Sequence, residues 1–322
     1  MKSKQTVGLA GASALAVSMA LTGCSAGADG PFPDDTITLV VPYPAGAAPD
    51  AGARIIAKQL EPELDVSVVV ENNEAGASTV GMHEVAESDP DGYTLGWGAS
   101  TGVTVQPRII DTPFEGVDAL TPIAQVNAVP NVLYSNADKD WETIDEFIAA
   151  AKKETLTVGL PQPGSAQHLQ VAMLEQEADI DLEEVHFDAG KMVLPAVNGT
   201  TDSSVSQPGP AAQYVDNGEL NFIGAFGEVP KGLEVKSFDD AGFDTSAMAS
   251  WEGVFGPKDM PDDVVTTLSD AIGTAVQSDE YQKFIKEAYG IPASLPADEF
   301  ARVVQKTDEA GAAIVDDLGL EQ

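Results

Sequence analysis

Small and hydroxyl-bearing residues concentrate in three short segments, 42–50, 72–81 and 98–102. Each segment follows a run with the composition of a strand, and the first two lead into stretches with helical spacing. In open α/β sheets such loops lie at the carboxyl ends of strands, where helix N-termini point free N–H groups outward. The glycines in these loops let a ligand approach the backbone closely. The three segments therefore predict a small-ligand site at one edge of a sheet.

Hydroxyl groups in two of these segments are candidate hydrogen-bond donors. Ser78 and Thr79 stand at the start of a predicted helix, so their side chains either cap that helix or donate to a ligand, and the two roles are compatible. Ser100 and Thr101 lie at the end of a predicted strand, three and four residues after position 97. We expect these two residues at the same site.

Asp50 and Arg54 each have a functional and a structural interpretation. Arg54 could hold a carboxylate through two parallel hydrogen bonds, or it could pair with Asp50 one helical turn before it. Asp50 could contact the ligand, or it could serve only to stabilise the start of the helix.

Residues 98–102 also fit the pattern G-x-S-x-G, which is typical of the nucleophile of an α/β hydrolase. His168 and His186 follow later in the chain, with aspartates between, as the order of a hydrolase requires. The alternative is therefore a secreted α/β hydrolase with Ser100 as the nucleophile. Because the pattern is short and no oxyanion motif accompanies it, we expect a protein that is not an enzyme and has no catalytic residue.

The composition excludes several classes of protein. Of the 322 residues, 16 are Lys or Arg and 52 are Asp or Glu, which gives a formal net charge of −36. A nucleic-acid-binding protein needs clustered basic residues, so this class is excluded. One cysteine cannot form an internal disulfide, and the three histidines lack metal-binding spacing. We expect no metal and no cofactor.

The first residues have the pattern of a bacterial targeting segment. Lys2 and Lys4 precede an apolar run over 7–20, which is shorter than the about 20 residues that a membrane-spanning helix needs. The sequence Leu-Thr-Gly-Cys that ends at Cys24 is similar to the lipobox of lipoproteins, in which the cysteine is lipidated. The alternative is an ordinary cleaved signal that contains a cysteine. We expect a signal peptide over 1–23 and a tether over 24–35.

The rest of the chain alternates strand and helix patterns, which predicts an α/β fold with a mostly parallel sheet flanked by helices. Thr143 and Glu146 form a capping box at the start of one helix. The predicted strands are 36–41, 66–70, 93–97, 156–160, 185–187, 220–226 and 251–255, and the predicted helices are 50–64, 78–87, 143–153, 165–177, 208–217, 261–277, 279–288 and 297–318.

Several short motifs occur in a fixed order between residues 36 and 318. They are Pro-Tyr-Pro-Ala-Gly at 42–46 with Asp50 and Arg54 after it, Val-Glu-Asn at 70–72 with Gly76, Thr79 and Gly81 after it, Pro-Asp-Gly-Tyr-Thr-Leu at 90–95, Gly164-Ser165 with His168, and the segment Trp251–Pro257. In this order they resemble the receptors of tripartite tricarboxylate transporters, also called the Bug or TctC family. The chain departs from the family pattern at Ala45, Ala47 and Ala48, where Pro, Gly and Ser or Gly are usual.

This resemblance implies a type II periplasmic-binding fold, with two α/β lobes around a ligand cleft. We expect one lobe to contain residues 36–125 and 226–322, and the other to contain 126–225. The family captures small organic carboxylates and passes them to a multi-span permease in the membrane. The protein is therefore expected to lie outside the cytoplasm as a monomer, held to the cell membrane by its lipid anchor. A binding protein that serves a membrane sensor in place of a permease is a further alternative.

The resemblance also implies which residues contact the ligand. Family receptors hold the carboxylate through the first two loops, and the second lobe closes over the rest of the ligand. Lys191 could meet the far end of an anionic ligand, or it could be an exposed lysine. The expected ligand contacts are Tyr43, Pro44, Ala45, Gly46, Ala47, Ala48, Asp50, Gly76, Ala77, Ser78, Thr79, Ser100, Thr101, Gly164, Ser165, His168, Gly190 and Lys191.

We predict that Cys24→Ala releases the protein from membranes, because the lipid is its only expected anchor and no other apolar run reaches ~18 residues. Cell fractionation with a carbonate wash measures this release. Retention of the variant in the washed membrane fraction would contradict the lipoprotein interpretation.

Overall fold

The computed structural model describes residues 32–320. The expected signal peptide 1–23, the lipidated Cys24 and the tether up to residue 31 lie outside these residues. The last expected tether residues pack on the fold, since Phe32 and Tyr93 stack edge to face with ring centroids 5.3 Å apart. The Tyr93 hydroxyl also donates a 2.7 Å hydrogen bond to the Asp34 carboxylate.

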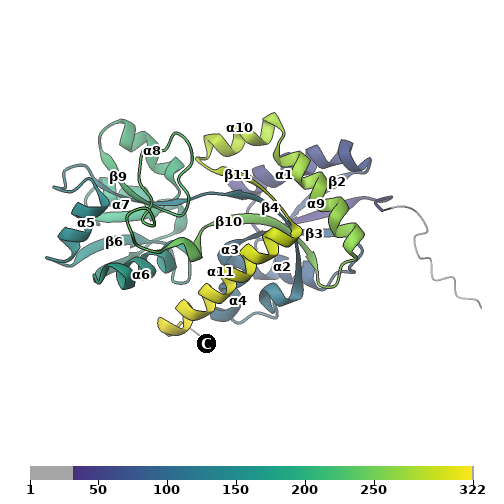
Figure 1. Ribbon diagram of the computed structural model, residues 1–322, viewed down its shortest axis with the longest axis horizontal. Coiled ribbons are helices and arrows are strands. Elements are labelled where there is room, and N and C mark those ends of the chain that lie inside the picture. Colours follow the sequence, from purple (N-terminus) through teal and green to yellow (C-terminus); the bar gives the residue numbers. More distant parts are fainter. Residues whose placement is uncertain (1–31, 321–322) are drawn as a thin grey trace, which may run out of the picture. The chain divides into compact units, whose positions relative to one another are not determined.

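Two mixed β-sheets form the centre of the described chain (Figure 1). The first sheet has six strands in the order β11-β4-β10-β3-β1-β2. Its strands are β1 (Ile37–Val41), β2 (Val68–Asn72), β3 (Thr94–Ala99), β4 (Leu120–Ala128), β10 (Trp251–Pro257) and β11 (Ile291–Pro296).

The second sheet has five strands in the order β7-β6-β8-β5-β9. Its strands are β5 (Asn131–Asn136), β6 (Leu156–Leu160), β7 (Leu182–His186), β8 (Ser203–Ser206) and β9 (Leu220–Phe226). Each sheet is parallel in one part and antiparallel in the other.

The expectation of a mostly parallel sheet is therefore wrong. In the first sheet, β10 runs antiparallel to both β3 and β4, and β11 runs antiparallel to β4. The sequence patterns missed β4, β5, β8 and β11. β4 and β5 follow one another with only residues 129–130 between them, but they lie in different sheets, so this link crosses between the sheets. The strand β10 in turn enters the first sheet from the second sheet, and it does not follow a helical crossover from a neighbouring strand of its own sheet, which is the connection that a parallel pair needs.

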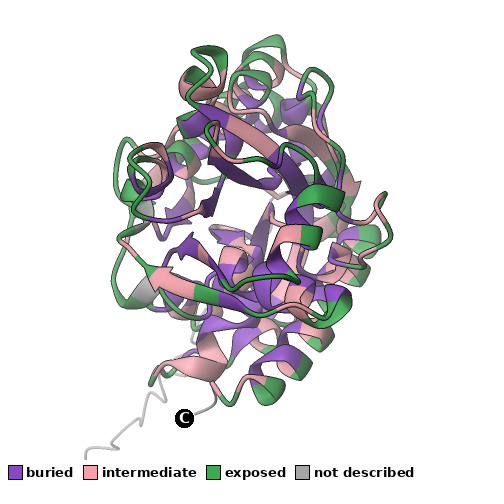
Figure 2. Cartoon of the chain, turned by 90° about the vertical axis from the view of Figure 1, so that its left-hand side faces the viewer, coloured by how far each residue is buried: buried purple, intermediate pink, exposed green. Residues whose placement is uncertain are grey.

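Helices cover both faces of each sheet. Buried residues lie along the strands, whereas exposed residues lie on the outer sides of helices and in loops (Figure 2). The helices of the first sheet are α1 (Ala48–Leu64), α2 (Thr79–Ala86), α3 (Ser100–Thr104), α4 (Gln106–Ile109), α9 (Asp262–Val276), α10 (Asp279–Glu287) and α11 (Ala297–Asp317). The second sheet has α5 (Ile144–Ala151), α6 (Ala166–Ala178), α7 (Val193–Val197) and α8 (Pro208–Asp216).

Two connections join the sheets. Residues 129–130 connect β4 to β5, and residues 227–250 connect β9 back to β10. The connections meet where the Val129 N–H donates a 3.2 Å hydrogen bond to the Ser250 carbonyl. The longer connection packs mainly on the second sheet, because Phe238 is buried in its core.

Helix α11 also links the two halves of the described chain. Its last turns place Ile314 and Val315 in an apolar cluster with Leu169 of α6 and with Met248. The two strand connections and the packing of α11 therefore contribute to holding the two sheets together.

We predict that Gly253→Ala destabilises the protein by about 1–3 kcal/mol, because a methyl group has no room in the middle of β10. It would collide with the Phe300 ring and lie 2.8 Å from the Ala124 carbonyl oxygen. Gly209→Ala in α8 is the matched control, since a methyl group there meets nothing within 4 Å. Urea unfolding measures both variants, and equal stabilities would contradict this account of β10 packing.

Candidate functional site

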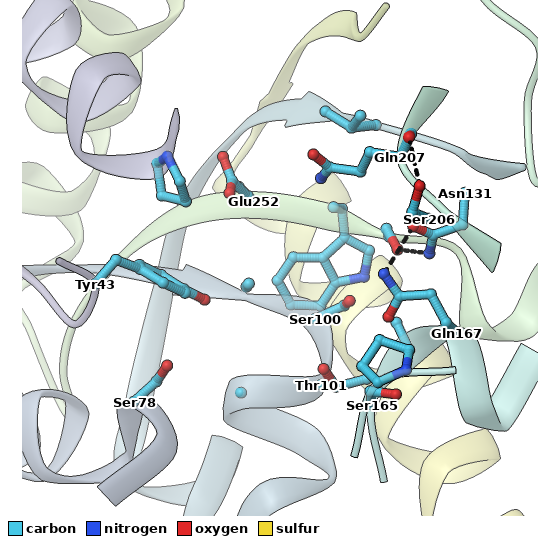
Figure 3. Close-up of a pocket in the computed structure, with 18 of the residues that line it drawn as sticks. Tyr43, Ser78, Ser100, Thr101, Asn131, Ser165, Gln167, Ser206, Gln207 and Glu252 are labelled. Atoms are coloured by element: carbon cyan, nitrogen blue, oxygen red, sulfur yellow. Dashed lines mark hydrogen bonds between the residues drawn. The ribbon is translucent and has the colours of Figure 1, made fainter. Parts of the chain in front are cut away.

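A pocket of about 460 Å³ lies between the two sheets, beside the crossing connections. One wall comes from the first sheet and includes Tyr43, Pro49, Ser78, Ser100 and Thr101. The facing wall comes from the second sheet, through the loops that open α6 and α8. The end of β4 and the starts of β5 and β10 also contribute (Figure 3).

A hydrogen-bond network around Asp50 fixes the first loop. The Asp50 carboxylate accepts from the Gly46 N–H at 2.8 Å, from the Arg54 guanidinium at 3.0 Å and from the Asn72 amide at 2.8 Å. The same Asn72 amide donates to the Tyr43 carbonyl at 3.0 Å. Burial opposes the charged form of Asp50, but these hydrogen bonds lower its pKa overall.

This network favours the structural interpretation of Asp50 and Arg54. Neither residue is part of the pocket lining. Their charges are directed at each other and at the loop backbone, so they position Tyr43 and Pro49, which do line the pocket.

The start of α2 presents Ser78 to the pocket in an unusual conformation. Ser78 has φ 80°, in the left-handed region that non-glycine residues seldom occupy. Its hydroxyl donates to the Pro42 carbonyl at 3.3 Å, which ties α2 to the first loop. Thr79 is buried and donates to the Gly76 carbonyl at 2.7 Å, so its hydroxyl is directed away from the pocket lining.

Ser100 and Thr101 line the pocket where β3 leads into α3, as Figure 3 shows. The two histidines of the hydrolase alternative lie elsewhere. The Nε2 atoms of His168 and His186 both face the Glu184 carboxylate at 3.4 Å, and neither ring lines the pocket. Neither of these two histidines is therefore placed to act as the base that a serine nucleophile at Ser100 would need.

Ser165 opens α6 on the opposite wall. Its hydroxyl accepts from the His168 backbone N–H at 3.3 Å, and the His168 Nδ1 atom accepts from the Gly164 N–H at 2.9 Å. Gly164 has φ +76°, and its carbonyl accepts from the Gln106 amide of α4 at 3.3 Å. The loop therefore supports the pocket through Ser165, while Gly164 and His168 shape its backbone.

Lys191 lies outside the pocket lining and forms an ion pair with Asp188 in which both side chains are largely exposed. Of the residues expected at the ligand, the pocket brings together Tyr43, Ser78, Ser100, Thr101 and Ser165. Outside the lining lie Pro44, Ala45, Gly46, Ala47, Ala48, Asp50, Gly76, Thr79, Gly164, His168, Gly190 and Lys191. The side chain of Ala77, also expected at the ligand, is outside what the structure describes.

The crossing strands supply pocket residues that the sequence patterns did not identify. Asn131 is buried and donates to Ser250 at 3.0 Å, while its amide oxygen accepts from Gln167 at 3.1 Å. Asn127, also buried, donates to the Glu252 carboxylate at 2.9 Å. Both asparagines stand inside the apolar run 126–133, and this pattern could have identified them from the sequence. Polar side chains in a buried strand need a local hydrogen-bond partner or a ligand.

Aromatic and amide groups complete the lining. The Trp251 indole N–H donates to the Thr307 hydroxyl of α11 at 3.0 Å, which fixes the ring against the pocket. On the second sheet, the Ser206 hydroxyl donates to the Gln207 carbonyl at 2.9 Å at the start of α8.

The pocket combines helix N-termini with a single acidic group. Pro49, Ser78, Ser165 and Gln207 belong to the first turns or N-caps of α1, α2, α6 and α8, where unpaired N–H groups and the helix dipoles favour negative charge. None of the described lining residues is Lys, Arg or His. Burial raises the pKa of the Glu252 carboxyl, whereas the Asn127 amide favours its charged form.

Residues 32–320 contain no cluster of three His, Cys, Asp or Glu side chains arranged to hold a metal ion. Within the same range, no helix is long and apolar enough to cross a membrane.

Comparisons with known proteins agree with this architecture. The chain is 26% identical to a UPF0065 protein of Bordetella pertussis, over 95% of this chain and 96% of that protein. A TctC solute binding protein from Polaromonas has a similar structure, with a TM-score of 0.82 and 25% identity over 89% of this chain and 100% of that chain. The expected fold, with two lobes of the periplasmic-binding type, is confirmed.

A second solved structure, MatC from Rhodopseudomonas palustris with bound malate, has a TM-score of 0.68 and 22% identity, over 88% of this chain and 100% of that chain. Residues 52–320 match the family described as the tripartite tricarboxylate transporter family receptor. The resemblance drawn from the sequence motifs is thereby confirmed, and the chain belongs to this family of solute-binding receptors.

Proposed function

We propose that the protein is a lipid-anchored receptor outside the cytoplasm that binds small organic carboxylates and delivers them to a multi-span permease. The pocket between the two sheets is the binding site. The contacts from the first-sheet wall are Tyr43, Ser78, Ser100 and Thr101, and Ser165 completes the site from the second sheet.

One observation carries this proposal: helices from both sheets begin at the same pocket. α1 and α2 begin on one wall, and α6 and α8 begin on the other. Each N-terminus carries roughly half a positive charge and several N–H groups without a partner in the helix. A carboxylate between these ends would accept hydrogen bonds from backbone groups and hydroxyls, so it would not need an arginine or a lysine.

The size of the pocket and the known relatives of the protein both support a small carboxylate as the ligand. A volume of about 460 Å³ lies within the range of small-molecule sites. MatC, which shares the fold, was solved with malate, a small dicarboxylate. The family description itself names a tricarboxylate transporter.

The crossing connections suit a receptor whose lobes close over a ligand. We propose that the lobes divide where the chain crosses, at residues 129–130 and near residue 250. These two segments touch each other and also line the pocket, so a ligand that contacts both walls would favour the closed arrangement. The anchor at Cys24 would keep the receptor beside the permease.

We predict that Gly102→Val weakens carboxylate binding by about tenfold or more without unfolding the protein. A Cβ atom at this position would lie 3.6 Å from the Ser78 Cβ atom and 3.9 Å from the Tyr43 hydroxyl, which are ordinary contacts. The two added methyl groups would occupy pocket space. Gly190→Val is the matched control, because a Cβ atom there meets nothing within 4 Å and the residue lies outside the lining.

The test is a thermal-shift screen of succinate, malate, glutarate and adipate with their amino derivatives, followed by calorimetric titration. A ligand at 100 times its Kd stabilises the folded state by about 2.7 kcal/mol. We expect at least one acid to stabilise the wild type and the control, with a loss of affinity of about tenfold or more in Gly102→Val. If the well-folded Gly102→Val variant binds the acid as tightly as the wild type, the ligand does not bind in this pocket. If the wild type binds none of the acids, the proposed function is contradicted.

A further inference from the structure

Glu252 places a carboxyl group inside a pocket that is otherwise suited to anions. It belongs to the start of β10, next to Trp251, and lies across the pocket from Ser78 and Thr101 in Figure 3. Among the described lining residues, only Glu252 has a side chain that ordinarily carries a charge at neutral pH.

The Glu252 carboxyl has a hydrogen-bond donor but no cationic partner. The Asn127 amide donates to its Oε2 atom at 2.9 Å and to the Tyr281 hydroxyl at 3.0 Å. None of the ion pairs within residues 32–320 includes Glu252. Burying a charged carboxylate without a cation costs free energy. A cationic group of a ligand at this point would therefore stabilise the charged form of Glu252.

The opposite side of the pocket has the reverse preference. Ser78 and Ser165 lie at the starts of α2 and α6, where helix dipoles favour an anion. A simple dicarboxylate that reached across the pocket would place its second negative charge near Glu252, and like charges at short range repel. A ligand with an anion at one end and a cation at the other would satisfy both sides.

We propose that Glu252 determines ligand specificity, and that the preferred ligand is a small organic acid carrying an ammonium group, which pairs with Glu252 while a carboxylate lies beside Ser78, Ser100 and Thr101. This inference rests on the proposed function, because it assumes that the pocket binds organic acids. It narrows the ligand to zwitterionic acids of the amino-acid type.

Ligand pairs that differ only by one ammonium group test this inference. The probes are succinate with aspartate, glutarate with glutamate, and adipate with 2-aminoadipate, titrated calorimetrically into the full-length protein in detergent. We compare wild type, Glu252→Gln and Glu63→Gln. The amide of Glu252→Gln keeps the shape and an acceptor for Asn127, whereas Glu63→Gln removes one exposed charge far from the pocket lining.

We expect the wild type and Glu63→Gln to bind the amino member of at least one pair about ten- to a hundredfold more tightly than the plain acid, as a charge-assisted hydrogen bond allows. In Glu252→Gln this preference should disappear or reverse. Circular dichroism and the melting temperature check that the variant is folded. If the Glu252→Gln variant fails to fold, the ratio of the two Kd values within each ligand pair, measured with the wild type, tests the inference alone.

Two results would overturn the inference. One is a wild type that binds the plain acids as tightly as, or more tightly than, their amino partners. The same result is expected if Glu252 is protonated and donates a hydrogen bond to a second carboxylate of the ligand. The other is a folded Glu252→Gln that keeps the wild-type preference. Both results leave the proposed function standing, whereas binding of none of the six acids would contradict the function and the inference together.

Discussion

An anion in this pocket has to be held without a cationic side chain, and that constraint shapes the site. The described lining contains hydroxyls, amides, aromatic groups and one carboxyl, but no Lys, Arg or His. Positive potential must therefore come from backbone N–H groups at helix N-termini. These groups are fixed by the fold, so their direction depends on where each strand ends and each helix begins.

Two features set those directions. The Asp50 carboxylate ties the first loop to Arg54 and Asn72, so Arg54 stabilises the loop and is not part of the pocket lining. The crossing connections bring β4, β5 and β10 to the same place, and buried asparagines link them to Glu252 and Ser250. The same strands that join the sheets thus carry the acidic group of the site.

The sequence predicted the α/β class and most of the helices, because their periodicity and caps are local. The family was predicted from the resemblance of several short motifs in their order along the chain. The Thr143 capping box is confirmed, since its hydroxyl accepts from the Glu146 N–H at 3.4 Å. The mixed sheets were not predictable in this way, because the direction of β10 and β11 depends on pairing with distant strands. Ser78 and Ser100 follow strand ends and could be predicted to lie at the pocket. Glu252 could not, since its position depends on the register that sets it opposite Asn127 of β4 and Ala99 of β3.

A crystal structure of the protein with an organic acid that raises its melting temperature tests the central claim most directly. The account predicts that the ligand occupies the pocket between the sheets, with its carboxylate oxygens about 3 Å from N–H groups or hydroxyls at the starts of α2, α3 or α6. A ligand bound outside this pocket, or a carboxylate paired with Lys191 or Arg54, would contradict it.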